Sequence, residues 1–300
     1  MSRITGRSSV APLNPWTNIS TGVANQAWGM SPATSTPTTG TGIPDASFAT
    51  YVGQKFDTSD GRELVMVANG AVALASGNLI QASAQITTAA NLAIAISTAY
   101  PATAGLYQLQ LTNTSTVMSA GQFNGGYAVV TAGTGIGQTY KINSHTPGTN
   151  AGLVTVTLED PIQTTFVTAS TTISLIANPY GGTSASAAGA VSNGVVYSPT
   201  TQSAGIVGVS LYPIAASTAP IYNTTSGVLA TAGVIQYGLI VCHGPASCLV
   251  DTVTLVGNAV GHSTAVSGAV AAATLTASAQ VGFLMNTAVS GAQGLIYLQL

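Results

Sequence analysis

The chain has 300 residues, of which only 4% are charged, and its five Lys or Arg and seven Asp or Glu give a formal net charge of −2. Soluble domains usually carry about 25% charged side chains, so Ser, Thr, Asn, Gln and backbone groups must hydrate this surface. The composition excludes a typical nucleic-acid-binding surface, because ~6 to 10 phosphate contacts need more cations than the whole chain carries. It also excludes charge-driven disorder, because 46% of the residues are hydrophobic.

Residues 1–44 contain five prolines and both tryptophans of the chain, Trp16 and Trp28. Proline at this density prevents a regular helix or a central strand, so we expect an extended arm. Two interpretations of the tryptophans stay open. They either anchor the arm on a partner, with Pro12 and Pro15 holding Trp16 in an extended approach, or they close the chain's own core.

From Phe48 onward the sequence changes to short runs of β-branched and aromatic residues bounded by Gly, Asn, Pro and Ser, which is typical of strands and turns. Only residues 89–96 would tolerate a helix, although Ile94 and Ile96 alternate as in a strand. The sequence therefore predicts an all-β fold. The predicted strands are Leu64–Val67, Val72–Leu74, Leu106–Leu111, Tyr127–Thr131, Val154–Leu158, Thr172–Ile176, Ile206–Leu211, Val234–Val241, Val250–Val256 and Gly294–Leu300.

Three parts are expected along the chain. Residues 1–44 form the arm, residues 45–120 a small β domain, and residues 121–300 a larger β-barrel or β-sandwich. A composition shift at residues 181–192, which are mostly Gly, Ser and Ala, predicts a flexible loop between two β units.

The C-terminal half is unusually poor in charge. After Asp160 the only charged side chain is Asp251, which leaves almost no electrostatic protection against self-association. We therefore expect a subunit whose faces are covered by copies of itself or by a scaffold. No tract supplies the ~20 predominantly apolar residues of a membrane span, and no apolar stretch follows Arg3 and Arg7, so we expect neither a span nor a secretory signal.

Charge is concentrated only in residues 57–63, Asp-Thr-Ser-Asp-Gly-Arg-Glu. A Ca²⁺ loop needs several oxygen ligands at alternating positions, and this segment offers three carboxylates with Arg62 among them. We favour a type I′ hairpin turn with local ion pairs. Asp57, Asp60 and Arg62 are then candidate partner-interface residues, together with the arm residues Pro12, Pro15, Trp16 and Trp28.

Cys242, His243 and Cys248 are short of the four ligands of a structural zinc site, although His262 could supply a fourth. A disulfide is a second alternative. We favour free buried thiols, Cys242 in a strand and Cys248 in a turn.

No other motif carries chemistry. Glu159 and Asp160 are adjacent, so in a strand they point to opposite faces, and Pro161 ends that strand. Residues 133–137, Gly-Thr-Gly-Ile-Gly, lack the Lys-Ser/Thr of a phosphate loop and are expected to form a hairpin. His145 and the other two histidines accompany no visible nucleophile. We expect no catalytic residue, cofactor or metal, and a glycan-cleaving enzyme could draw paired carboxylates only from residues 57–63.

Several runs of the sequence resemble structural proteins of tailed-phage virions, in which a DGR turn precedes a short strand and glycine-punctuated hairpins. The resemblance covers most of the chain after the arm. The matching runs are Gly53–Gln81, Gly121–Tyr127, Gly135–Ile142, Val154–Pro161, Ile176–Gly181 and the closing run Val281–Leu300.

This resemblance implies a capsid decoration or cement protein, similar to the lambda-type head-stabilising proteins that sit as trimers on the shell. It implies a small domain of the β-tulip kind, the major capsid protein and further copies of the chain as partners, synthesis in the host cytoplasm, and a final place on the capsid exterior of the virion. The alternative is a tail fibre or receptor-binding virion protein, which the Ser, Thr and Gly content favours and the lack of repeats disfavours.

Overall fold

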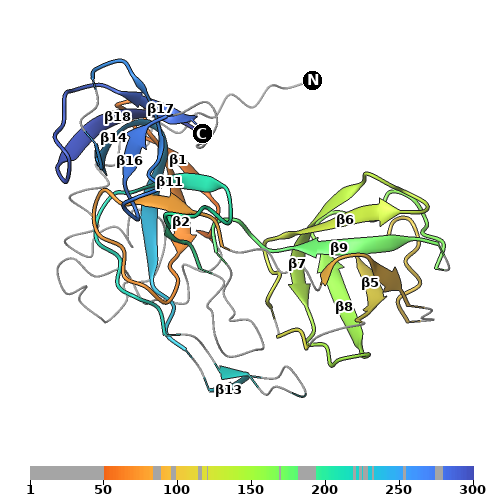
Figure 1. Cartoon of the computed structure of the whole chain (residues 1–300). Coiled ribbons are helices and arrows are strands. Elements are labelled where there is room, and N and C mark those ends of the chain that lie inside the picture. The colour runs from red at the N-terminus through yellow and green to blue at the C-terminus, as the bar shows by residue number, and fades with distance from the viewer. Residues whose placement is uncertain are drawn as a thin grey trace.

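The structure is a computed structural model of the whole chain (Figure 1). It describes residues 51–83, 89–95, 99–113, 117–119, 121–168, 170–181, 194–218, 221–222, 225, 229–231, 233–252, 255–273 and 280–300. The expected arm, with Pro12, Pro15, Trp16 and Trp28, lies outside these residues, as does most of the expected loop at 181–192.

The described residues form eighteen β-strands and no α-helix, so the predicted all-β fold is confirmed. The segment at 89–96, which could have tolerated a helix, contains strand β4 (Leu92–Ile94) with the burial pattern of alternating faces. Two predicted strands are wrong. Val72–Leu74 contributes only an isolated bridge at Leu74. Of Val250–Val256 the structure describes residues 250–252 and 255–256, and among these only Val250 forms a bridge, beyond the end of a long strand.

Six strands close into a barrel in the order β4-β5-β8-β7-β6-β9. Apolar and polar residues alternate along β5, so one side of the strand faces the barrel core. Leu109 and Leu111 are fully buried, while Gln108 and Gln110 hydrogen-bond across the outer face to threonines of β8. Besides β4, the barrel strands are β5 (Gln108–Thr112), β6 (Tyr127–Ala132), β7 (Thr139–His145), β8 (Leu153–Leu158) and β9 (Thr172–Ile176).

A second sheet has ten strands, eight of them in the order β10-β3-β11-β14-β18-β17-β15-β16, with β2 paired to β14 and β1 to β2. Its strands are β1 (Lys55–Asp57), β2 (Glu63–Ala68), β3 (Leu79–Gln81), β10 (Val196–Tyr197), β11 (Ile206–Ser210), β14 (Tyr237–Leu249), β15 (Ala259–His262), β16 (Val270–Ala272), β17 (Gln280–Leu284) and β18 (Gln293–Gln299). A separate pair consists of β12 (Ile221–Tyr222) and β13 (Leu229–Thr231).

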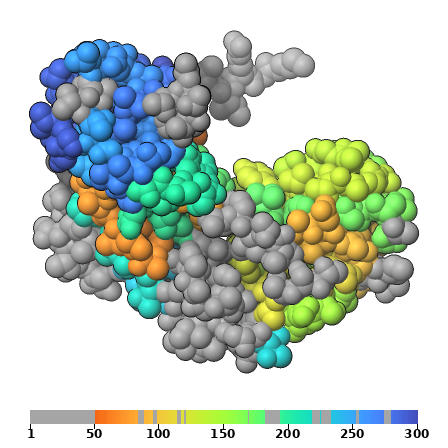
Figure 2. All heavy atoms as spheres, viewed as in Figure 1, coloured from red at the N-terminus to blue at the C-terminus, as the bar shows by residue number. Residues whose placement is uncertain are grey.

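The barrel is inserted into the ten-stranded sheet. The chain leaves the sheet after Gln81, builds the barrel from β4 to β9, and returns at Val196. Figure 1 shows the resulting two lobes, with the barrel in yellow and green and the sheet in orange and blue, and Figure 2 shows the same lobes as filled surfaces. The division expected near residue 120 therefore falls inside the barrel, between β5 and β6, and the sheet lobe combines both ends of the described chain.

Strand β14 organises the sheet lobe. It is 13 residues long, and it pairs with β2 through its first half and with β18 through its second half. The ladder with β2 shifts register between Val241 and His243, and Gly244 has a φ of +92°. In a regular strand Val241 and Ala246, which are five positions apart, would point to opposite faces. Both pack in the same hydrophobic cluster, so the bulge has switched which side chains face the core.

Candidate interaction site

The charged segment 57–63 forms the connection of the β1–β2 hairpin, as expected. The loop is five residues long, from Thr58 to Arg62, instead of the predicted two-residue type I′ turn, and its only positive φ is at Gly61. Thr58 closes the loop, because its side-chain oxygen accepts from the Arg62 backbone N–H at 3.1 Å and its backbone N–H donates to the Arg62 carbonyl at 2.9 Å, while its hydroxyl donates to Asp60. The hairpin therefore holds its charged side chains in a defined place.

The ion pairs expected here are present. Arg62 lies 2.6 Å from Asp60, and Lys55 lies 3.1 Å from Glu63. The Arg62 side chain, together with the Thr58 hydroxyl, lowers the pKa of Asp60 to about 2, and the hydrogen bond to Glu63 raises the pKa of Lys55. The Arg62 side chain is only 16% exposed, so Asp60 balances a cation that the fold has partly withdrawn from water.

The bend of β14 packs directly on this hairpin. A β-carbon at Gly244 would meet the Gly61 carbonyl oxygen at 2.9 Å and the Arg62 Cα at 3.1 Å, and its φ of +92° also favours glycine. Pro245 follows at the bend, where the ladder to β2 has already ended. The hairpin and the bend thus form one corner of the sheet lobe.

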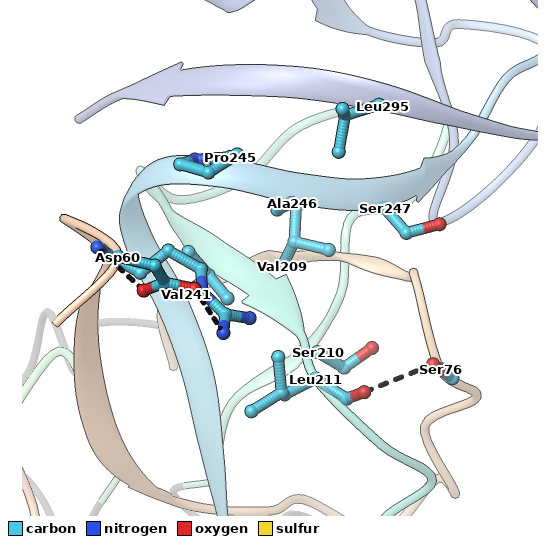
Figure 3. Close-up of a pocket in the computed structure, with 11 residues that line it drawn as sticks. Asp60, Ser76, Val209, Ser210, Leu211, Val241, Pro245, Ala246, Ser247 and Leu295 are labelled. Carbon is cyan, nitrogen blue, oxygen red and sulfur yellow. Dashed lines mark hydrogen bonds and ion pairs between the residues drawn. The ribbon is translucent and has the colours of Figure 1, made fainter. Parts of the chain in front are cut away.

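A hollow of about 560 Å³ lies at this corner (Figure 3). Its walls are about equally polar and apolar, with three serine hydroxyls and the Asp60–Arg62 pair supplying the polar part. The lining comes from the β1–β2 hairpin, β11, both halves of β14, β18 and the turn before β3. Its residues are Asp60, Arg62, Ser76, Val209, Ser210, Leu211, Val241, Pro245, Ala246, Ser247 and Leu295.

Half-buried aromatic rings continue from the hollow along the outer face of β14, β18 and β17. The ring of His243 meets that of Tyr297 edge-on, with centroids 5.5 Å apart, and Phe283 stacks on the other side of Tyr297 at 5.3 Å and an interplanar angle of 11°. Tyr297 is the cross-strand partner of Pro245, which lines the hollow. The rings of His243, Tyr297 and Phe283, which we call the aromatic ladder, therefore lie next to the hollow on one surface.

The structure brings together two of the predicted interface residues, Asp60 and Arg62, at the hollow, and places Asp57 one strand away on β1. The aromatic ladder was missed. The sequence signal that could have revealed the ladder is the alternation of the last strand. Leu295 and Tyr297 there point away from the buried Ile296 and Leu298. The neighbours of that face in β14 could not be deduced, because β14 and β18 are joined across about 50 residues of sequence.

The two cysteines are free and buried, and both lie in β14, so Cys248 is in a strand and not in a turn. Burial raises the pKa of the Cys242 thiol and raises that of Cys248 to about 12. Both therefore stay protonated at neutral pH and act as small apolar side chains. Within the described ranges, no three His, Cys, Asp or Glu side chains gather as metal ligands would.

The other predicted turns have local explanations. β8 ends at Leu158, three residues before Pro161, and Glu159 pairs with Lys141 at 2.9 Å. Residues 133–137 connect β6 to β7 as the expected hairpin, with Gly137 N–H donating to the Val130 carbonyl at 2.9 Å. These positions are explained by the backbone and carry no visible chemistry.

His145 is a structural histidine of the barrel. Its Nδ1 lies 2.8 Å from the Thr146 carbonyl, which can only accept, so Nδ1 carries the proton. Its Nε2 accepts the Phe123 backbone N–H at 3.0 Å, and its ring is tilted against that of Phe123 at 5.5 Å. The hydrogen bond from Phe123 therefore requires a neutral imidazole, because a protonated Nε2 has no lone pair to accept it. Burial favours the same neutral form and lowers the pKa of His145.

We expect acid to destabilise the barrel through His145. An unfolded histidine titrates near pH 6.5, above the folded value, so the unfolded state binds more protons between these two pKa values. The stability from His145 should be complete above about pH 6.5 and fall as the pH drops towards the folded pKa. Thermal melting from pH 8 to pH ~5 measures it. In His145→Gln this decline should be reduced, whereas His243→Gln should keep it; equal declines in both variants would contradict the assignment.

No protein-family model matches the chain, and no similar curated protein or solved structure is found. No described helix is long and apolar enough to span a membrane. The protein is an all-β protein with a barrel inserted in a ten-stranded sheet. One surface of its sheet lobe carries a charged hairpin, a hollow and an aromatic ladder.

Proposed function

We propose that this protein is a structural subunit of a phage particle, a decoration protein that binds the outer surface of the head shell and stabilises it. Its partners in this proposal are the major capsid protein and further copies of itself, as a trimer. The observation that carries the proposal is a group of exposed apolar side chains in the C-terminal part of the sheet lobe, where the sequence is almost without charge. Leu255, Val256 and Val289 are 65%, 56% and 65% exposed, and Asp251 is the only charged residue after Asp160.

These exposed side chains gather at one end of the sheet. Leu255 and Val256 lie between β14 and β15, and Met285 and Val289 lie between β17 and β18. The two connections are joined, because Gly257 N–H donates to the Leu284 carbonyl at 2.8 Å. A clustered apolar surface is typical of a face that a partner covers. It supports contact between subunits or with a shell more than it supports a free monomer.

The resemblance of the DGR hairpin and of the closing strand to phage structural proteins supports the same function. A protein of this kind is made in the host cytoplasm and ends on the exterior of the capsid. It needs no catalytic group, and we expect none here. Substituting Asp57, Asp60, His145 or His243 should then alter stability or assembly without abolishing any turnover.

Imaging of purified virions carrying a label on this protein tests the proposal. We expect the label on the outer surface of the head, at regular positions. A label confined to the tail would contradict decoration and favour the tail-fibre alternative. As a second readout, the bound protein should stay on the particle when NaCl is raised to ~1 M, because uncharged contacts have little Coulomb energy for ions to screen. Its release without unfolding would also contradict the proposal.

The arm provides a sharper test with purified heads that lack the protein. Deleting residues 1–44 should abolish binding to these heads. Trp16→Ala should weaken it by about 2 kcal/mol, whether Trp16 docks on the major capsid protein or on a neighbouring bound subunit, since interface tryptophans are often hot spots. The melting temperature of the free protein should not change with Trp16→Ala. Gly205→Ala is a matched control, because a β-carbon there meets nothing within 4 Å. Wild-type binding by the deletion variant, or unfolding of Trp16→Ala, would favour a tryptophan in the chain's own core.

A further inference from the structure

The hollow and the aromatic ladder together form a surface that is suited to an extended peptide. We call this surface the aromatic face and define it by Pro245, Phe283, Leu295, Tyr297 and the hollow beside them. All four side chains point away from the core of the sheet lobe, because they alternate with buried neighbours on β14, β17 and β18. Leu295 is 39% exposed and the rings of Phe283 and Tyr297 are half-buried, so their apolar area is open to a partner.

The polar groups of the hollow are already engaged as donors. Ser76 donates to the Leu211 carbonyl at 3.2 Å, Ser247 donates to the Gln293 side chain at 3.2 Å, and Ser210 donates to the Ala75 carbonyl. Their oxygens keep lone pairs that can accept a hydrogen bond. The site therefore favours an apolar ligand that brings its own N–H donor, and the indole of tryptophan is such a group.

The arm contains a segment with this chemistry. Pro12-Leu-Asn-Pro15 has the P-x-x-P spacing of polyproline segments, which dock on aromatic-lined grooves in an already extended conformation. Trp16 follows at once. The segment brings an indole and two proline rings, whereas the chain after residue 44 contains no tryptophan.

Charge favours the same pairing. Residues 1–44 contain Arg3 and Arg7 and no acid. The hairpin beside the hollow carries Asp60 and, one strand away, Asp57, whose side chain has no ion-pair partner among the residues that the structure describes. An arm lying with Trp16 in the hollow would bring Arg7 within reach of these carboxylates, because nine residues span up to about 30 Å.

We propose that residues 12–16 of one copy dock on the aromatic face of a second copy. Tyr51 and Val52, where the described chain begins, pack on the main hydrophobic cluster of the sheet lobe, to which Val241 and Ala246 of the hollow also belong. The 35 residues from Trp16 to Tyr51 span at most about 120 Å, enough to reach the aromatic face of a neighbouring copy. The inference rests on the self-association that the proposed function includes, but it requires no capsid.

The two tryptophans make the test direct, because both lie in the arm. In the full-length Trp28→Phe variant, fluorescence reports on Trp16 alone. We expect blue-shifted emission and protection from acrylamide in the oligomer, and a shift to the red with loss of protection on dilution to the monomer. Sedimentation at the same concentrations measures the oligomer.

Leu295→Lys, in the same Trp28→Phe background, should weaken self-association about 30-fold, the equivalent of 2 kcal/mol at a hot spot. Val266→Lys is the matched control, because Val266 is 39% exposed, as Leu295 is, and lies between β15 and β16 of the same lobe, outside the aromatic face and outside the apolar end at Leu255 and Val289. Melting curves verify that both variants fold.

Three results would overturn the inference. Trp16 could be fully exposed in the oligomer, its burial could be independent of concentration, which would place the arm on its own copy, or Leu295→Lys and Val266→Lys could behave alike. Failure here leaves capsid decoration standing, since head binding is measured separately. Failure to bind heads would in turn leave the contact between copies intact.

Discussion

Replacing Phe123 with alanine should lower the free energy of unfolding of the barrel by about 3 to 5 kcal/mol, the usual cost of a large aromatic side chain lost from a core. Phe123 is the largest of the fully buried side chains and packs in the cluster that fills the barrel. Truncation would also remove the ring contact to His145. The cavity could not collapse easily, because a closed barrel holds its walls through a continuous hydrogen-bonded ladder.

Calorimetry with Phe123→Ala also tests the independence of the two lobes. The barrel and the sheet lobe have separate hydrophobic clusters, so we expect the barrel transition to fall by at least about 12 °C and the sheet transition to stay. Ile296→Ala, in the core of the sheet lobe, should do the reverse. Leu153→Ala is a surface control, since Leu153 is 52% exposed. If Phe123→Ala moved both transitions equally, the lobes would be one cooperative unit.

Gly282→Ala should destabilise the sheet lobe by about 3 kcal/mol, the upper part of the usual range for overpacking. A β-carbon at Gly282 would press on the Tyr297 carbonyl oxygen and lie 2.9 Å from the carbonyl carbon and 3.2 Å from the Leu298 Cα. These atoms are backbone atoms of the neighbouring strand β18, so no side-chain rotation relieves the contact. Strands β17 and β18 would have to move apart beneath the aromatic ladder.

Chemical unfolding followed by near-ultraviolet circular dichroism measures this effect, because Phe283 and Tyr297 stack beside the substitution. Gly205→Ala is again the matched control and should change stability by less than about 0.5 kcal/mol, as surface substitutions usually do. Equal stability of the two variants would show that β17 and β18 do not lie as closely as the structure has them.

Local pattern was sufficient for the fold class and for many individual elements. Thr172–Ile176 was predicted with its observed bounds, because a run of β-branched residues between turn residues can bury one face only as a strand. The hairpins at residues 57–63 and 133–137 were recognised for a similar reason, since glycine and charged or hydroxyl residues favour tight turns wherever they occur. Positions 72–74 and the described part of 250–256 have a similar local composition, but each contributes only one isolated bridge, at Leu74 and at Val250, so composition was a wrong guide there.

Long-range pairing decided the rest. The insertion of the barrel could not be predicted, because β2 pairs with β14 across more than 160 positions of sequence. Neither segment contains a sequence feature that identifies the other as its partner. The hollow depends on the bulge before Gly244, which bends β14 over the hairpin at Gly61. The aromatic face likewise needs β14 beside the consecutive strands β17 and β18, across about 50 residues of sequence. Strand propensity and alternation are local properties of a few residues, whereas register, order in the sheet and the shape of a surface arise only when distant segments bury their apolar faces together.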